Sequence, residues 1–252
     1  MGKLISLWRK AGRFLSKAEA VASPISMTSY EVEAAPPNEL KPAIPVIQLK
    51  EILSEEILVP LLEPMEKDGH INLLELLVIN QLVKKLQPQK IFEIGTFDGR
   101  TTLNMAASAP KDSNIFTLDL PPFKVDYTKL NLEYNDRRYI EKPASGILFQ
   151  GSPYHSKIQQ LYGDSATFDF SPFNDSIDFV FVDGSHSYEY VINDTLRALE
   201  MSKKQHSIIL WHDYASPCWP GLQKALDELY IQDARLSQAK HIEGTKFLVL
   251  FR

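Results

Sequence analysis

The stretch that decides the fold is Lys90-Ile-Phe-Glu-Ile-Gly-Thr-Phe-Asp-Gly-Arg-Thr-Thr-Leu103. Its apolar beginning, Ile91 to Ile94, predicts a short buried strand, and Arg100 onward predicts the first turn of a helix. Between them, Gly95 to Gly99 predict a tight loop. Glycines in such a loop let the chain turn sharply and let a ligand approach bare backbone. The stretch therefore predicts a strand, a glycine loop and a helix around a ligand.

The spacing of the two glycines bears on the kind of ligand. A dinucleotide fingerprint has the form G-x-G-x-x-G, whose middle glycine makes room for a pyrophosphate. Phe97 stands at that middle position, and the acidic Glu93 lies just upstream. Bulk and negative charge both disfavour a pyrophosphate, and both are compatible with a ligand that carries an ammonium and a sulfonium. Glycines after an apolar strand are also ordinary turn chemistry, and this alternative stays open.

The stretch resembles motif I of the class I S-adenosylmethionine (SAM)-dependent methyltransferases, whose pattern is roughly acidic-x-Gly-x-x-x-Gly. The resemblance implies an α/β fold with a Rossmann-like sheet of seven mostly parallel strands, an antiparallel last strand, and helices on both faces. It implies SAM as cofactor. The residues of this stretch that it places around SAM are Glu93, Gly95, Thr96, Phe97, Gly99 and Thr101.

Strands and helices alternate along the rest of the chain. Apolar runs predict strands at 114–120, 158–163, 177–184 and 207–211, and a terminal hairpin at 240–242 and 246–251. Helical periodicity predicts helices at 72–86, 101–109, 189–201 and 221–230. Asn72 followed by Glu75 resembles a capping box at the start of the first helix, and its leucine stripe indicates core. This alternation is typical of an open, mostly parallel α/β sheet.

The composition excludes several classes of protein. Apolar residues make up 44% of the chain and charged residues 23%, which are ordinary globular values. A net charge of −5 gives no general nucleic-acid footprint. Cys218 is the single cysteine, so no internal disulfide can form. No apolar run approaches the roughly 20 residues that span a bilayer, and Arg9, Lys10 and Arg13 interrupt any signal-peptide core. We therefore expect a cytoplasmic protein.

Three segments of different character divide the chain. The pattern of residues 1–22 predicts a basic amphipathic helix. Such a helix would either contact a membrane peripherally or pack on this domain or on a second subunit of a homo-oligomer. Residues 23–47 are a Pro-rich linker. Residues 48–252 form the predicted catalytic domain. Within it, residues 121–156 are an aromatic-rich insertion that we expect to lie over the carboxyl edge of the sheet, as a lid, a substrate wall or an oligomer contact.

Polar residues gather at the predicted strand ends, where open α/β sheets bind ligands. Asp119 ends the second strand about 20 residues beyond the glycines, the spacing of an acid that accepts hydrogen bonds from ribose hydroxyls. Asp164 and Ser165 follow the third strand and are placed to bind the adenine amino group, although Gly-Asp-Ser is also an ordinary turn. The ionisable residues at this edge are Glu93, Asp119, Asp164, Asp183, His186, His212 and Asp213. Together they predict a binding site.

The last four of these predict the reaction centre. Asp183, His212 and Asp213 offer carboxylate and imidazole ligands that suit a divalent cation such as Mg²⁺ or Mn²⁺. Such a cation would lower the pKa of a substrate hydroxyl. His186 lies three residues beyond Asp183 and is placed to take the proton. The resulting oxyanion would attack the sulfonium methyl group, with positioning as the main source of rate.

A second stretch sharpens the resemblance. Asp183-Gly184-Ser185-His186-Ser187-Tyr188, with Asp194 downstream, resembles the D-G-x-H-x-Y-…-D signature of macrocin O-methyltransferase-like enzymes, and more distantly the catechol O-methyltransferase group. In that group the first acid of an Asp-x-x-Lys motif binds metal and the Lys is the base, so the resemblance implies that His186 replaces the Lys. The relatives' later motif is Asp-Asp-Tyr or Asp-Asn. It reads His212-Asp213-Tyr214 here, and imidazole is a poor ligand for Mg²⁺.

The sequence therefore predicts a SAM-dependent methyltransferase that acts on a small-molecule acceptor, on a hydroxyl oxygen, with metal assistance left open. Asp183 and His186 are the predicted catalytic residues, and Asp183 also borders the cofactor. Walls of the acceptor pocket are predicted from Trp211, Tyr214, Cys218 and Trp219. Two alternatives remain: a metal-dependent hydroxylase or hydrolase on the same scaffold, and a non-catalytic adaptor that works through its N-terminal helix.

Overall fold

The computed structural model describes residues 41–252. The predicted amphipathic helix at 1–22 and most of the predicted linker lie outside these residues. The described residues belong to one compact unit. Its sheet has the strand order β1-β7-β8-β6-β5-β2-β3-β4. The strands are β1 (Val46–Ile47), β2 (Lys90–Ile94), β3 (Asn114–Asp119), β4 (Ile158–Tyr162), β5 (Phe179–Val182), β6 (Ile208–Trp211), β7 (Lys240–Ile242) and β8 (Leu248–Phe251).

The pairing confirms the predicted α/β sheet and corrects its strand count. Strands β4, β3, β2, β5 and β6 run parallel to one another, and β8 runs antiparallel to both β6 and β7. The sheet has eight strands instead of seven, because Val46 and Ile47 pair in parallel with His241 and Ile242. Those two residues had been predicted as the end of the Pro-rich linker. Pro45 holds this segment extended, and its carbonyl accepts from the His241 backbone N–H.

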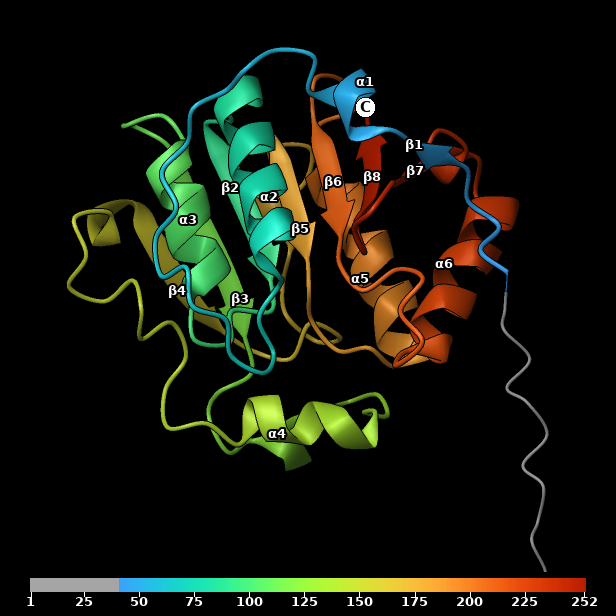
Figure 1. Ribbon diagram of the computed structural model, residues 1–252. Helices are drawn as coiled ribbons and strands as arrows, with labels where there is room; N and C mark the ends of the chain where they lie inside the picture. Colours follow the sequence, from blue (N-terminus) through green and yellow to red (C-terminus); the bar gives the residue numbers. More distant parts are fainter. Residues whose placement is uncertain (1–40) are drawn as a thin grey trace, which may run out of the picture. The chain divides into compact units, whose positions relative to one another are not determined.

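Helices cover both faces of the sheet (Figure 1). Those with at least nine residues are α2 (Leu73–Leu86), α3 (Arg100–Ser108), α5 (Tyr188–Met201) and α6 (Pro220–Gln232), and shorter ones are α1 (Leu49–Ile52) and α4 (Arg137–Ile140). Alternate side chains of a strand point to opposite faces. Phe179 and Phe181 pack with α2 and α3, whereas Val180 and Val182 pack with α5 and α6. Within residues 41–252, no helix is long and apolar enough to cross a membrane.

Helix α2 shows why its sequence folds as predicted. Asn72 is the N-cap, its Oδ1 accepts from the Glu75 backbone N–H, and Glu75 Oε2 accepts from the Asn72 backbone N–H, so the predicted capping box is confirmed. Leu76, Ile79 and Val83 of the predicted stripe are fully buried. The helix ends at Gln87, whose left-handed backbone precedes Pro88.

The insertion at 121–156 lies over the carboxyl ends of the parallel strands, as predicted. Figure 1 shows α4 crossing that end of the sheet. Short 3-10 helices at Val125–Tyr127, Tyr134–Asp136 and His155–Lys157 make up the rest of its regular structure. The segment contributes buried charged groups, Asp136 and Lys142, as well as apolar side chains such as Phe149, which joins the core that includes α2 and α3. The insertion therefore covers the carboxyl ends of the strands, where the site lies.

Candidate active site

A cavity of about 440 Å³ opens at the carboxyl ends of β2, β3, β4, β5 and β6, under the insertion. Residues 67–70, which precede α2, form part of its wall. The predicted cofactor residues that line it are Gly95, Thr96, Phe97, Thr101, Asp119, Asp164, Ser165 and Asp183. The predicted reaction-centre residues His186, His212 and Asp213 line it as well. The structure therefore brings together most of the residues that the sequence assigned to one site.

The glycine loop after β2 requires glycine for a steric reason. Gly95 has φ +98°, and a Cβ at this position would lie 2.0 Å from the Asp183 carbonyl oxygen. Gly99 has φ +87°, and a Cβ there would lie 2.6 Å from the Phe149 ring. Phe97, between them, also has a positive φ of 49°. The loop thus packs against the end of β5 and keeps backbone exposed to the cavity.

Glu93 lies on the wrong side of its strand to reach a cofactor directly. It is fully buried outside the cavity lining, and its Oε2 accepts from the hydroxyls of Thr102 on α3 and Thr117 on β3. Burial raises the pKa of Glu93 to about 8, against the two hydroxyl hydrogen bonds. Glu93 therefore links β2 to α3 and β3 and does not face the cavity. Gly99 also lies outside the lining residues.

Asp119 ends β3 at the cavity, where the ribose-binding acid was predicted. Its Oδ2 pairs with the ammonium of Lys142 at 2.9 Å and accepts from the Ser145 hydroxyl at 2.7 Å. Burial raises the pKa of Asp119, and Lys142 opposes that shift. Both partners come from the insertion. The insertion and the end of β3 are therefore joined at this carboxylate.

Asp164 and Ser165 follow β4 and line the next part of the cavity. The Asp164 carboxylate accepts from the Tyr190 hydroxyl at 2.9 Å and from the Lys129 backbone N–H at 2.7 Å. Ser165 hydrogen-bonds to Asp194, a buried acid of α5 whose pKa burial raises to about 6. These contacts make a polar pocket wall beside the glycine loop.

His186 is held between two carboxylates. Its Nδ1 lies 2.6 Å from Asp136 Oδ1, and its Nε2 lies 3.0 Å from Asp213 Oδ2. Asp136 also accepts from the His186 backbone N–H and from the Ser185 hydroxyl. Trp219 stacks on the imidazole with ring centroids 4.0 Å apart. Burial opposes a charge on the ring, but the bonds to Asp136 and Asp213 raise the pKa of His186 to about 9.

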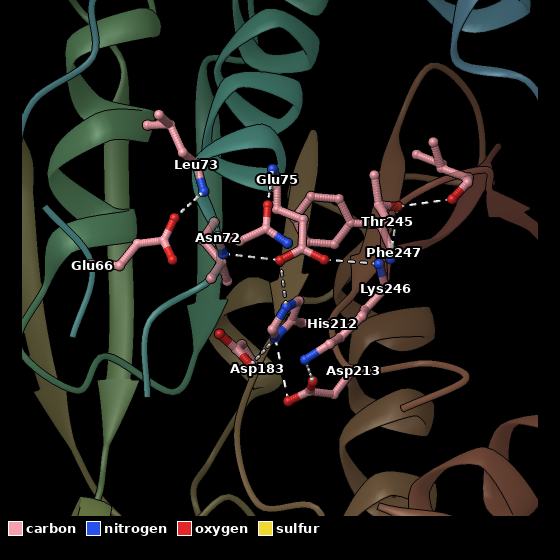
Figure 2. Close-up of polar contacts among 12 residues, drawn as sticks. Glu66, Asn72, Leu73, Glu75, Asp183, His212, Asp213, Thr245, Lys246 and Phe247 are labelled. Carbon is pink, nitrogen blue, oxygen red and sulfur yellow. Dashed lines mark hydrogen bonds and ion pairs between the residues drawn. The ribbon is translucent and has the colours of Figure 1, made fainter. Parts of the chain in front are cut away.

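His212 lies in a second arrangement of the same kind (Figure 2). Its Nε2 lies 3.2 Å from Glu75 Oε2, and its Nδ1 lies 3.2 Å from Asp183 Oδ1 and 3.4 Å from Asp213 Oδ2. Burial disfavours the charged ring, yet Asp183, Asp213 and Glu75 raise the pKa of His212 well above its ordinary value. Lys246 completes the group, with its ammonium 3.0 Å from Asp213 Oδ1. Despite burial, the two histidines lower the pKa of Asp213.

Part of the chain is similar to a known protein family. Residues 92–214 match a family model described as a methyltransferase domain. This segment contains the glycine loop, Asp119, Asp164, Asp183, His186 and His212-Asp213. This segment is therefore similar to a methyltransferase domain. No curated protein matches the chain in sequence.

Solved structures share the fold of this chain at low sequence identity. The O-methyltransferase TomG from Streptomyces achromogenes, in complex with SAM, is 14% identical with a TM-score of 0.51, over 75% of this chain and 90% of TomG. PaMTH1 from Podospora anserina, bound to S-adenosylhomocysteine (SAH), is 16% identical with a TM-score of 0.52, over 72% and 79%. An O-methyltransferase from Bacillus cereus, in complex with SAH, is 14% identical with a TM-score of 0.51, over 73% and 82%.

Two residues that were predicted to form walls of the acceptor pocket, Trp211 and Tyr214, do not line the cavity. Trp211 is buried in the core, where its Nε1 donates to the Thr195 hydroxyl. The Tyr214 hydroxyl donates to Asp227 and accepts from the Ile44 backbone N–H, so it anchors the segment before β1. Cys218 and Trp219 do line the cavity.

Several charged residues of the site had not been predicted. They are Glu75, Asp136, Lys142, Lys246 and the pair His70 and Asp98, whose side chains lie 2.8 Å apart. Glu75 had been predicted only as part of a capping box, and its contact with His212 leaves no signal in the sequence. The insertion has no periodic pattern to mark Asp136 or Lys142. Lys246 carries one signal: it is a cation in a hairpin that pairs with β6, the strand that His212 follows.

The paired His186 predicts a pH-dependent stability. Because its folded pKa is raised to about 9, the stabilisation is fully present below about pH 6.5 and is lost as the pH rises through about 9. Asp136→Asn is expected to reduce this loss, which amounts to at most about 3 kcal/mol. Urea midpoints measured across this range would show it. Asp126→Asn, an exposed acid of the same insertion, is the control, and an equal effect of both variants would contradict the assignment.

Proposed function

We propose that the protein transfers the methyl group of SAM to a hydroxyl oxygen of a small-molecule acceptor. The observation that carries this proposal is the cavity of the methyltransferase domain, which the glycine loop, Asp119 and Asp183 line together. The similar folds of TomG and the Bacillus cereus O-methyltransferase, solved with SAM and SAH, support the cofactor and the oxygen acceptor.

The cofactor takes the half of the cavity nearest β2, β3 and β4. Gly95 and Phe97 offer backbone to the methionine moiety, and Asp119 accepts from the ribose hydroxyls, because it ends β3 at the cavity. Asp164 and Ser165 border the adenine. The acceptor then lies towards Tyr139, Trp219 and Lys246, which line the remaining wall.

In this reaction Asp183 is the base. Its Oδ1 faces His212, and its side chain is 20% exposed towards the cavity, so a second oxygen is available to an acceptor hydroxyl. The acceptor oxygen attacks the methyl carbon of SAM, and the bond between that carbon and the sulfonium sulfur breaks, so SAH leaves. The proton of the acceptor hydroxyl passes to Asp183. His186 had been predicted as the base. Both its ring nitrogens face carboxylates, so both carry protons and no lone pair remains to accept another.

A divalent cation had also been predicted, on Asp183, His212 and Asp213. The donor atoms that lie within 4.8 Å of one another in the described residues belong to Asp183, His186 and Asp213 instead. Each of these groups already has a partner of opposite charge, and imidazole suits Mg²⁺ poorly. The residues present therefore do not fit the cation, and the proposed reaction has no step through it.

Calorimetric titration of SAH into the full chain tests the cofactor. We expect saturable binding, weakened about 10- to 100-fold in Asp119→Asn, because a hydrogen bond to a charged group contributes about 1.5–3 kcal/mol. Asp178→Asn is the control: Asp178 also pairs with a lysine, Lys203, but lies at the opposite end of the sheet, before β5. It should leave SAH affinity unchanged. No SAH binding to the wild type would overturn the proposed function.

A further inference from the structure

We infer that the cavity carboxylates Asp183 and Asp213 are neutralised by cations of the chain itself, His212 and Lys246, in place of a divalent metal ion. We infer further that Glu75 positions His212 for this task. The inference rests on the proposed function and deepens it, since it describes how most of the negative charge around the base Asp183 is offset. Its tests need neither turnover nor SAH.

The contacts of His212 define its charge. Both ring nitrogens lie 3.2 Å from carboxylate oxygens, those of Glu75 and Asp183. A neutral imidazole has one N–H, so one of these contacts would set a lone pair against an anionic oxygen. The doubly protonated ring donates to both. Because the ring is only 7% exposed, water cannot replace either partner. His212 is therefore a fixed buried cation at the end of β6.

Glu75 is the least exposed member of the group, at 1%. Its Oε2 accepts from the Asn72 backbone N–H and faces His212, while its Oε1 accepts from the Lys246 backbone N–H at 2.8 Å. Figure 2 shows the carboxylate between the start of α2 and the hairpin residues 245–247. It is thereby held on three sides. Glu75 thus fixes the orientation of the His212 ring. Through its bond to the backbone N–H, it also fixes the main-chain position of Lys246.

Both carboxylate oxygens of Asp213 already face cations. Its Oδ1 pairs with Lys246 at 3.0 Å, and its Oδ2 pairs with His186 at 3.0 Å and with His212 at 3.4 Å. To coordinate a metal ion, His186 Nε2 would need a free lone pair. In our inference this nitrogen carries the proton that it donates to Asp213. In charge terms, the four carboxylates of Glu75, Asp136, Asp183 and Asp213 meet three cations, His186, His212 and Lys246. The cluster then carries one residual negative charge.

Manganese binding tests the first part of the inference. Mn²⁺ is titrated into the full chain and followed by electron paramagnetic resonance. We expect the wild type to leave Mn²⁺ free. The double variant Glu75→Gln/His212→Asp, which removes the buried anion and the internal cation together, should bind one Mn²⁺ at least about 100-fold more tightly. One Mn²⁺ bound by the wild type and lost in Asp213→Asn would overturn the inference. A double variant that keeps wild-type near-UV circular dichroism yet leaves Mn²⁺ free would also overturn it.

The protonation of His212 tests the role of Glu75. Histidine ¹⁵N resonances, assigned by comparison with His212→Gln, distinguish a ring with two protonated nitrogens from a neutral one. We expect two protonated nitrogens near pH 7 in the wild type and in Glu51→Gln. Glu51 is the matched control, because it closes the capping box of α1 without a histidine contact. Glu75→Gln should leave one nitrogen unprotonated. A neutral His212 in the wild type, or an unchanged ring in Glu75→Gln, would overturn the assignment.

Discussion

Asp183→Asn is expected to lower kcat for methyl transfer by a factor of about 10² to 10⁴, the range that loss of a general base produces. The amide of Asn cannot take the acceptor proton, but it keeps the size of the side chain. SAH affinity should change by less than about threefold, because the loop backbone and Asp119 carry cofactor binding in our proposal. The measurement is SAH formation from SAM, with an acceptor found by screening hydroxylated small molecules.

Asp68→Asn is the matched control for this experiment. Asp68 also lines the cavity as a carboxylate paired with a cation, Arg138, but it lies at the exposed rim, 70% accessible. Its substitution should leave kcat within about twofold, because exposed ion pairs contribute little. Equal losses in the two variants, or an unchanged kcat in Asp183→Asn, would remove Asp183 from the reaction.

Gly95→Ala is expected to unfold the cofactor loop and to abolish SAH binding. The Cβ would lie 2.0 Å from the Asp183 carbonyl oxygen and 2.9 Å from the Gly184 nitrogen, and neither backbone atom can move without displacing the end of β5. The positive φ of 98° adds strain for any L-residue. We expect a loss of about 3–5 kcal/mol in the free energy of unfolding, measured by urea denaturation.

Gly151→Ala separates the two sources of this loss. Gly151 has a similar positive φ of 76°, but nothing lies within 4 Å of the position that a Cβ would take. It should cost only the conformational penalty, about 1 kcal/mol. SAH binding should be retained. If Gly95→Ala cost no more than Gly151→Ala, the close approach of β2 and β5 would not be what requires glycine.

The sheet could be predicted from the sequence because each parallel strand is a short apolar run followed by a helix. The run at 177–184 became β5, with Phe179 to Val182 buried on both faces. The strand β1 could not be predicted in this way. Two residues after Pro45 carry no alternation, and Val46 is more than half exposed. Only the position of β7 in space makes that segment a strand.

Glu93 shows a limit of the motif as a guide to contacts. Residue types at 93, 95 and 99 matched the resemblance, and Gly95 lines the cavity. The period of two in a strand, however, places Glu93 on the same face as Ile91, towards α3. That alternation was readable in the sequence. It indicates a buried acid under the loop instead of one that faces the ligand.

The strand-end residues of the site were predictable, but their partners were not. Parallel strands end at one edge, so Asp119, Asp183 and Asp213 had to be near one another. Their counterions come from segments without a pattern. Lys142 belongs to an irregular insertion, and Glu75 belongs to a helix whose leucines account for its core contacts. Such pairings depend on three-dimensional packing and leave no local signal.

The bond between Glu75 and the Lys246 backbone joins residues 171 positions apart in the chain. Strands β2, β3, β4 and β5 pair with one another without the terminal hairpin. His212 and Asp213, by contrast, have all their partners only when β8 lies between β6 and β7, because Lys246 comes just before β8. Closing a chain segment of this length costs conformational entropy. The charge cluster is therefore complete only in a chain whose C-terminal residues are in place, and the same residues join helix α2 to the sheet.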